Sequence, residues 1–275
     1  MVYPVSAPVE NASFAAETLT GRPPSFTESY LSLPSRPPQR TFVQSSPRDH
    51  WDAQPQAGTL YQVGELAPLL RGGYAGIFSL NDLRSVIGTH SEGLGTFHAL
   101  DGELVMIEGE VYQVESDGHP HRVDANSSTP FLATFNIEAS TAIMIDPARD
   151  LHLQDGENPA ALARALSTFL NPNLAYGVVI VSRFDSILFR SPPRQTEPYP
   201  VFSAVQATQF PLTNTAATLV GTFTPSDLRN VSGAGLHLHG LTNDRQQGGH
   251  VLGFNLPLGA LIFVTPLDHV EVLRR

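Results

Sequence analysis

The residues best suited to chemistry are three histidines near the C-terminal end of the chain. His237 and His239 stand in Gly235-Leu-His-Leu-His, and His250 stands in Gly248-Gly-His-Val-Leu. Residues two apart in a β-strand point to the same face, so His237 and His239 are expected side by side. His250 follows His239 by eleven residues, behind a polar loop and a Gly-Gly pair. This spacing predicts a hairpin-like return that sets His250 opposite the other two histidines.

Three converging imidazoles indicate a metal site. Neutral imidazole is a common ligand of zinc, copper, iron and nickel. The chain has no cysteine, so thiolate ligands are excluded and any metal must be held by His, Asp, Glu or water. Three histidines leave at least one coordination position open, which is typical of a catalytic zinc site. The sequence therefore predicts bound Zn²⁺, or another divalent transition metal, at His237, His239 and His250.

A histidine pair has two other common interpretations. An isolated pair is more often a surface or cross-strand feature, and His119-Pro-His121 is an example, because it lies in a polar region without a third histidine. Cupin barrels also use such a pair, but they usually place a glutamate within a few residues of it. Here no glutamate follows His239 before Glu271. The spacing therefore argues against a cupin.

Composition excludes several classes of protein. The chain has 275 residues, 41% of them hydrophobic, which is enough for a large core. Its net charge is −10 and its 16 basic residues are all arginine, without the basic cluster expected of a nucleic-acid binder. The N-terminus lacks the features of a signal peptide, and no apolar run approaches the roughly 20 residues that span a bilayer. We expect a cytoplasmic protein with neither a nucleic-acid nor a membrane partner.

The pattern of residues divides the chain in two. Residues 1–57 contain 9 of the 23 prolines and little periodic hydrophobicity, so we expect a proline-rich N-terminal arm that drapes over the domain or a partner. Residues 58–275 form the predicted catalytic domain. Helices are expected around Leu66, over 80–87 with Ser79 as N-cap, and over 157–170 with Pro159 in the first turn.

Most of the remaining apolar segments are typical of strands. Asp101-Gly102, Glu108-Gly109 and Asp117-Gly118 fit tight turns, and a further turn is expected at Phe184-Asp185. The expected strands are 96–97, 103–107, 111–114, 131–137, 176–182, 186–190, 217–223, 235–239, 250–255 and 260–265. Strands and helices do not alternate strictly, which predicts an α+β fold with mixed or antiparallel sheets.

Several motifs together resemble the acetolactate decarboxylase family. The histidine segment, with Asp244-Arg between its parts, resembles the metal-binding segment of that family. Other matches occur in family order from about Leu60 to the C-terminus, and their ordered co-occurrence is highly specific. They are Gly93-Leu-Gly-Thr-Phe-His-Ala-Leu-Asp-Gly-Glu103, Tyr112-Gln113, Thr129-Pro-Phe131, Arg190-Ser-Pro-Pro-Arg194-Gln-Thr-Glu-Pro-Tyr199 and Gly221-Thr-Phe-Thr-Pro225.

The resemblance implies an activity, a fold and a set of site residues. The family converts 2-acetolactate to acetoin and carbon dioxide with a zinc ion held by three histidines. By position, His237, His239 and His250 match those ligands, Glu103 and Arg190 match catalytic residues, and Thr96 and Arg190 match the substrate pocket. The family fold is α+β, with two β-sheet subdomains and a few helices, and its members are commonly homodimers. A small carboxylate or keto acid is the expected substrate.

This chemistry is physically coherent for the residues concerned. Loss of carbon dioxide from a β-keto acid leaves an enediolate, whose charge a metal stabilises as a Lewis acid. Arg190 offers a planar bidentate partner for a carboxylate, and Glu103 can transfer the proton that quenches the enediolate. Taken alone, Glu103 fits a polar turn residue after Asp101-Gly102 better than a catalytic one, and the alternative role of Arg190 is a surface ion pair. Arg194 is a second candidate for the carboxylate.

Two departures from the family pattern keep other hypotheses open. The chain stops at Arg275, where the family has a tail that brings in another glutamate, and Glu271 lies too early to match it. Gly240 stands where the family usually has a bulky aromatic residue, which predicts a larger pocket. The first hypothesis is a zinc-dependent decarboxylase of acetolactate or a related 2-hydroxy-3-keto acid. The alternative is a metalloenzyme of secondary metabolism with the same fold that isomerises, cyclises or decarboxylates a larger substrate. A third is a metal-binding protein without activity.

Overall fold

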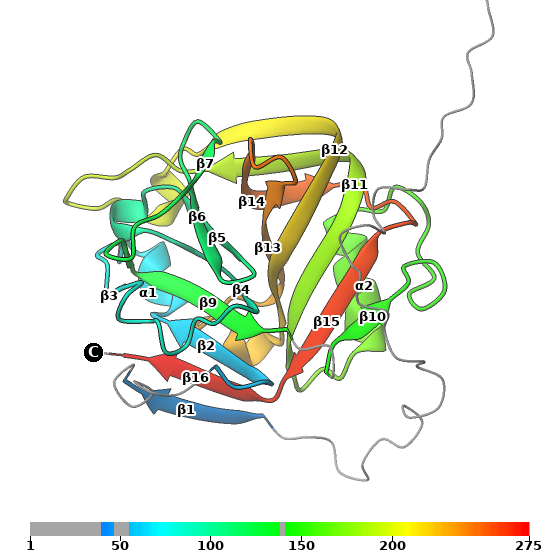
Figure 1. Cartoon of the computed structure of the whole chain (residues 1–275), viewed down its shortest axis with the longest axis horizontal. Coiled ribbons are helices and arrows are strands. Elements are labelled where there is room, and N and C mark those ends of the chain that lie inside the picture. The colour runs from blue at the N-terminus through cyan, green and yellow to red at the C-terminus, as the bar shows by residue number, and fades with distance from the viewer. Residues whose placement is uncertain (1–39, 47–54, 138–140, 275) are drawn as a thin grey trace, which may run out of the picture. The chain divides into compact units, whose positions relative to one another are not determined.

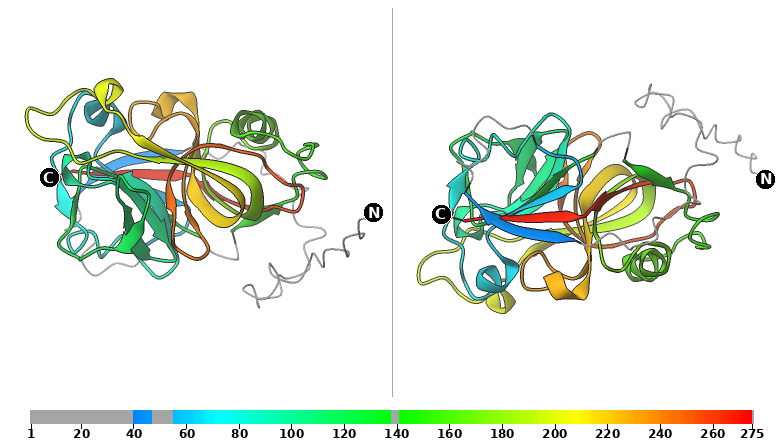
Figure 2. Two further views of the ribbon diagram at one scale, coloured as in Figure 1. Left: turned by 90° about the horizontal axis from the view of Figure 1, so that it is seen from above. Right: turned by 90° about the horizontal axis from the view of Figure 1, so that it is seen from below.

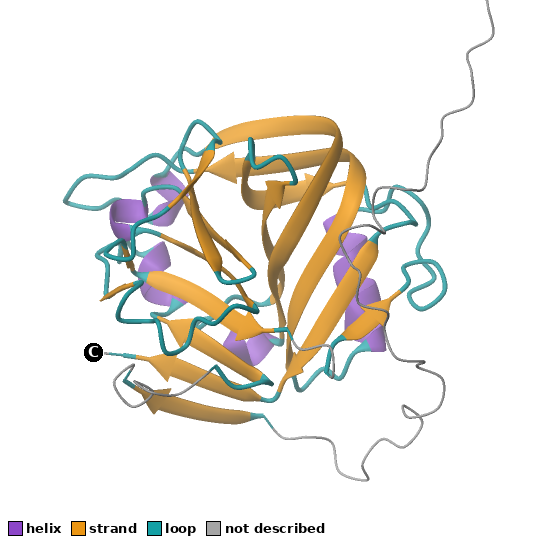
Figure 3. Cartoon of the chain, viewed as in Figure 1, coloured by secondary structure: helices purple, strands orange, loops and turns teal. Residues whose placement is uncertain are grey.

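The structure, a computed structural model, describes residues 40–46, 55–137 and 141–274. All of them belong to the larger of two compact units of the chain, 38–275. Most of the predicted N-terminal arm lies outside the described residues. Strands dominate and the helices are few and short, which confirms the expected α+β class (Figure 3). Within the described residues, no helix is long and apolar enough to cross a membrane.

The first sheet has eight strands in the order β1-β16-β2-β9-β4-β5-β6-β7 (Figure 1). The pairings of β16 with β1 and with β2 are parallel and the others are antiparallel, so the sheet is mixed. β1 comes from the predicted arm. The strands are β1 Thr41–Ser45, β2 Thr59–Val63, β4 Ser91–Thr96, β5 Glu103–Ile107, β6 Glu110–Val114, β7 Pro120–Arg122, β9 Phe131–Asn136 and β16 His269–Leu273.

The second sheet is antiparallel and has six strands in the order β10-β15-β11-β12-β13-β14. β11 also pairs with β14, so β11, β12, β13 and β14 close a ring of hydrogen-bonded strands. A separate pair joins β3 Phe78–Ser79 to β8 Ser128–Thr129. The strands of the second sheet are β10 Ile143–Ile145, β11 Ala175–Ser191, β12 Thr208–Thr224, β13 Gly235–Thr242, β14 Gly248–Phe254 and β15 Leu261–Leu267.

Two of the three predicted helices form. They are α1, Leu66–Leu70, and α2, Pro159–Phe169. Asn158 is the N-cap of α2, and its side chain accepts a hydrogen bond from the Ala161 amide at 3.0 Å. The apolar face of α2 packs on the second sheet, beside which Figure 2 shows the helix. Among the described residues, short 3₁₀ turns lie in the loops at η2 His98–Leu100, η3 Phe202–Ala204 and η4 Ser226–Leu228.

The helix predicted over 80–87 is wrong, because this segment forms consecutive turns. Ser79 Oγ does accept from the Asp82 amide at 3.2 Å, as a helix cap would. The following bonds span three residues, from Leu83 N to Leu80 O at 3.1 Å and from Val86 N to Leu83 O at 2.9 Å. A period of three brings these apolar side chains to one side, and all three are buried in the core.

The turn predicted at Phe184-Asp185 is also wrong, because β11 runs through it as one strand of 17 residues. Phe184 is fully buried and pairs with Thr215 of β12. Pairing along the whole of β12 and burial of the aromatic ring outweigh the low strand propensity of aspartate. The turn at Glu108-Gly109 is confirmed, since both residues have positive φ, 51° and 75°, as a two-residue type I′ hairpin requires.

The two sheets pack together through an apolar layer that includes Val105 and Val114 of the first sheet and Val220 and Leu241 of the second. Glu92 of β4 is a buried carboxylate in the first sheet, with 7% of its surface exposed. One oxygen accepts from the Glu108 amide at 3.2 Å, and the other has no hydrogen-bond partner among the described residues. Burial raises the pKa of Glu92 to about 8, against the opposing effect of the Glu108 amide.

Replacing Glu92 with glutamine should remove a pH-dependent cost of folding. The pKa of Glu92 in the folded state exceeds its ordinary value of 4.5, so folding becomes less favourable as the pH rises through the interval up to about 8. Glutamine keeps an acceptor for the Glu108 amide and carries no charge. We expect Glu92→Gln to raise the free energy of unfolding by roughly 2–4 kcal/mol near pH 8 and by much less near pH 5. Urea denaturation measures both, with exposed Glu110→Gln as control. An equal effect at the two pH values would contradict this assignment.

Candidate active site

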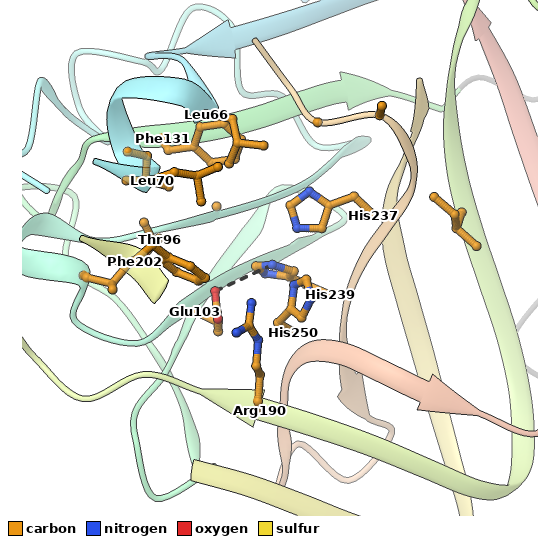
Figure 4. A pocket seen from close by; sticks show the side chains of 16 residues that line it. Leu66, Leu70, Thr96, Glu103, Phe131, Arg190, Phe202, His237, His239 and His250 are labelled. Carbon is orange, nitrogen blue, oxygen red and sulfur yellow. Dashed lines mark ion pairs between the residues drawn. The ribbon is translucent and has the colours of Figure 1, made fainter. Parts of the chain in front are cut away.

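The three histidines meet where β13 and β14 lie side by side. His237 and His239 share one face of β13, and His239 pairs directly with His250 of β14. The ring centroids are 5.1–5.3 Å apart, and one ligand nitrogen from each ring lies within 4.8 Å of the others. The convergence expected from the spacing is confirmed (Figure 4).

Burial and hydrogen bonds prepare these imidazoles to act as ligands. The Nδ1 of His239 lies 2.8 Å from the Leu104 carbonyl of β5. A carbonyl only accepts, so Nδ1 carries the proton and Nε2 keeps a free lone pair. Burial, with a contribution from the Arg190 charge, lowers the pKa of His237 to about 4. Burial and the neighbouring histidines hold the pKa values of His239 and His250 well below the ordinary value. All three rings are therefore neutral near pH 7, the state that binds metal.

Glu103 is the first residue of β5 and lies between the sheets rather than in a turn. It is 5% exposed and pairs with Thr96 of β4. One carboxyl oxygen lies 3.6 Å from Nε2 of His239, the contact marked by the dashed line in Figure 4. Burial raises the pKa of Glu103 to about 8, and Arg190 offsets part of the rise. Burial thus favours the protonated form of this carboxyl group beside the histidines.

Arg190 of β11 is placed by backbone pairing. It stands opposite His250, which in turn stands opposite His239, so the three residues form a row across three strands. A shift of register between Leu188 and Phe189 precedes this pairing. Figure 4 shows the side chain directed toward Glu103 and the histidines.

The surface ion pair considered for Arg190 is not formed with any residue that the structure describes. Its Nε is buried without a hydrogen-bond partner among them, and its Cζ lies 5.1 Å from the ring centroid of Phe202. Arg194, the second candidate for a carboxylate, instead pairs with Asp101 at 2.9 Å, with 57% of its side chain exposed. Arg194 does not line the pocket described next.

A pocket of about 320 Å³ opens beside the histidines. This volume is at the small end of the roughly 300–1,000 Å³ typical of small-molecule sites. Its polar end holds the three histidines, Glu103, Arg190 and Thr96, whose hydroxyl donates to the Gly102 carbonyl at 2.6 Å and keeps acceptor capacity. The other lining residues are mainly apolar: Leu66, Leu69, Leu70, Gly95, Leu100, Phe131, Phe202, Gly233, Ala234 and Leu236.

Gly240 does not enlarge this pocket, contrary to the prediction. Successive residues of β13 face opposite sides, so Gly240 points away from the side that carries His239. A Cβ atom at Gly240 would meet the side chain of Leu219 at 2.4 Å and that of Phe189 at 3.3 Å, both in the core of the second sheet. The position therefore sets packing behind the histidines rather than the volume in front of them.

Some parts of the site carried no signal in the sequence. The apolar wall is built from leucines and phenylalanines that are indistinguishable from core residues, and the partner of His239 is a backbone carbonyl, which every residue has. His119 and His121 lie outside the cluster, as expected of an isolated pair, and His119 Nδ1 is 2.8 Å from the Gln246 carbonyl.

Comparison with known proteins gives a consistent result. A family model described as alpha-acetolactate decarboxylase matches residues 60–272. The alpha-acetolactate decarboxylase of Methanosarcina mazei is 33% identical over 222 residues, 78% of this chain and 72% of that protein. That of Raoultella terrigena is 34% identical over 208 residues, 74% of this chain and 76% of that protein. The crystal structure of alpha-acetolactate decarboxylase from Bacillus subtilis strain 168 superimposes with a TM-score of 0.70 at 26% identity, covering 79% of this chain and 89% of that one.

The histidine cluster predicts stoichiometric metal binding that depends on each ring. The purified protein should contain about one divalent transition-metal ion per chain, and His237→Ala or His239→Ala should lose most of it, because two imidazoles bind far more weakly than three. Elemental analysis of the purified proteins measures this. His119→Ala is the matched control, since this histidine lies outside the cluster. Equal metal content in all four proteins would contradict the assignment.

Proposed function

The chain belongs to the alpha-acetolactate decarboxylase family, and from this premise we propose that it is a zinc-dependent decarboxylase of acetolactate or a related 2-hydroxy-3-keto acid. The observation that carries the proposal is the grouping of three neutral imidazoles, a protonated carboxyl group and a guanidinium in one pocket. In the proposed reaction each of them has a separate task.

The donor set fits a zinc ion. His237, His239 and His250 would hold it through three nitrogens that lie close enough to share one ion, and the hydrogen bond from His239 to Leu104 fixes the orientation of one ring. When bound, the metal supplies a Lewis acid that stabilises negative charge on oxygen atoms of the substrate.

Arg190 is proposed to bind the substrate carboxylate. Its guanidinium makes no ion pair with the described residues, so its N–H groups remain available to a ligand. A guanidinium and a carboxylate match as planar groups with two parallel hydrogen bonds. This contact would orient the bond between the carboxyl carbon and the rest of the substrate, which is the bond that breaks, at the polar end of the pocket. Thr96 is proposed to add a weaker contact to the substrate from the opposite sheet.

Glu103 is proposed to supply the proton. When the bond to the carboxyl carbon breaks, carbon dioxide leaves and the electron pair stays on the remaining carbon framework as an enediolate. Glu103 is a carboxylic acid at neutral pH and lies beside the histidines, so it can donate its proton to that carbon and take up another from water. The C–C bond to the carboxyl carbon and the O–H bond of Glu103 are broken, one C–H bond is formed, and water returns the proton to Glu103, so the charges balance.

The alternative of a larger substrate loses its support, because Gly240 points away from the pocket and the pocket is small. The apolar end suits the alkyl groups of a short branched keto acid. The homodimer and the cytoplasmic location expected from the sequence stay predictions. Light scattering on the protein as it elutes from a size-exclusion column tests whether it is a homodimer.

Racemic acetolactate is the direct substrate test. Zinc-loaded protein should release acetoin and carbon dioxide in equal amounts, and protein treated with a chelator should lose this activity and recover it when zinc is restored. Acetoin can be measured by chromatography against a no-enzyme control, since acetolactate also decarboxylates spontaneously. Rates equal to that control from fully metal-loaded protein would reject the proposed function.

Two substitutions separate the proposed roles of the polar side chains. Glu103→Gln keeps the size of the side chain and removes the transferable proton, so kcat should fall by about 10²–10⁴-fold while metal content is unchanged. Arg190→Lys keeps the charge but loses bidentate geometry, so KM should rise by about tenfold or more. Steady-state kinetics with elemental analysis measure both. Full turnover in Glu103→Gln would exclude the glutamate as proton donor, whereas a protein that bound metal without any turnover would support the non-catalytic hypothesis.

A further inference from the structure

Arg190 is held in an unusual way for a residue that binds a carboxylate. Its backbone is fixed on both sides, opposite Gln209 of β12 and His250 of β14. Its side chain has neither an ion pair nor a hydrogen bond to any residue that the structure describes, and Nε is buried. Long arginine side chains have many rotamers, and no hydrogen bond or ion pair to a described residue fixes the direction of the guanidinium.

The aromatic ring of Phe202 is the neighbour placed to do this. The guanidinium carbon lies 5.1 Å from the ring centroid, within the range of a cation–π contact. Phe202 also lines the pocket, and Figure 4 shows its ring beside Glu103 and near the end of Arg190. The ring therefore touches the cation and faces the ligand space at once.

The segment that carries Phe202 is itself well anchored. η3 is closed by hydrogen bonds from Ala204 N to Val201 O at 2.9 Å and from Val205 N to Phe202 O at 3.0 Å. η3 also packs against α1, and the Phe202 ring packs against a core that includes Leu69 and Tyr74. The ring thus has a fixed position, against which the flexible side chain of Arg190 can pack.

The preceding loop is tied to the first sheet. Gln195 N donates to the Ala99 carbonyl at 2.7 Å, and Arg194 pairs with Asp101 at 2.9 Å. The loop therefore leaves β11 of the second sheet and is held against the connection between β4 and β5. The position of the Phe202 ring therefore depends on both sheets. The position of Glu103 relative to the histidines depends on both sheets in the same way.

We propose that Phe202 is a positioning residue that holds the Arg190 guanidinium by a cation–π contact and leaves its N–H groups free for the carboxylate of a 2-hydroxy acid. An acidic residue in the same place would fix the arginine equally well, but it would occupy the donors and compete with the ligand. The face of an aromatic ring attracts the cation, but it does not accept the hydrogen bonds that the N–H groups donate in the plane of the guanidinium. The inference rests on the proposed function only in taking a carboxylate as the ligand of Arg190.

The test uses a pair of ligands that cannot react. Zinc-loaded protein is titrated by calorimetry with 2-hydroxy-2-methylpropanoate, which has no keto group, and with the corresponding amide, which has no negative charge. Phe202→Leu keeps an apolar side chain and loses the ring, and should weaken binding of the acid about tenfold more, or about 1.4 kcal/mol more, than binding of the amide. Phe202→Tyr keeps the aromatic face and should bind the acid as the wild type does. Val201→Ala, an exposed neighbour that does not line the pocket, is the matched control.

A double substitution shows whether Phe202 acts through Arg190. In an Arg190→Gln background, Phe202→Leu should cause no further loss of acid binding, because the cation is already gone. The proposal is overturned if the two losses add, if acid and amide are weakened alike, if Phe202→Tyr is as weak as Phe202→Leu, or if the wild type does not prefer the acid. Acetoin release is measured separately. If the protein shows the expected binding of acid and amide but releases no acetoin, the proposed decarboxylase activity is rejected and the proposed role of Phe202 stands.

Discussion

The pairing of β11 with β14 is the constraint on which the site depends. It places Arg190 opposite His250, and the adjoining pairing of β14 with β13 places His250 opposite His239. Because β11 pairs with β12 along its whole length and β12 continues to β13, the four strands close on themselves. A ring of this kind cannot slip by one residue in a single strand, since such a slip would turn every side chain of that strand to the other face. The distances among the three histidines are therefore fixed by backbone hydrogen bonds throughout the second sheet.

Burial between the two sheets then sets the protonation of the site. The same desolvation lowers the pKa values of the histidines and raises that of Glu103, because in each case it disfavours the charged form. The imidazoles take the neutral form, which is the form able to bind a metal, and the carboxyl group favours the protonated form, so one physical cause sets both kinds of group. The hydrogen bond from His239 to the Leu104 carbonyl joins the two sheets at this point. It links the orientation of the His239 ring to the strand that begins with Glu103.

The pocket divides into a polar end and an apolar end with different structural origins. Strands β4, β5, β11, β13 and β14 supply its charged and hydrogen-bonding groups, whereas α1, η3 and loop segments supply most of its apolar lining. Rigid strands suit the charged and hydrogen-bonding groups, because the chemistry depends on the distances between them. The connecting segments suit the walls that decide which substituent fits. The region that matches the family, residues 60–272, contains all the pocket-lining residues, while β1 lies before it and adds a parallel strand at the edge of the first sheet.

The histidine cluster could be predicted from the sequence because its signal is local: alternation in one strand and a short return to the next put all three rings within a few residues of a hairpin. The amphipathic α2 and the Glu108-Gly109 turn were predictable for the same reason. The segment over 80–87, the continuity of β11 through Asp185 and the outward direction of Gly240 were decided by tertiary packing, which outweighed local propensity in each case. Glu103 and Arg190 come from strands that are distant in the sequence. Their types alone fit ordinary turn or surface roles, and only the resemblance to the family singled them out. Only the packing of one sheet on the other, which removes water from both groups and brings them beside the histidines, makes them parts of one site.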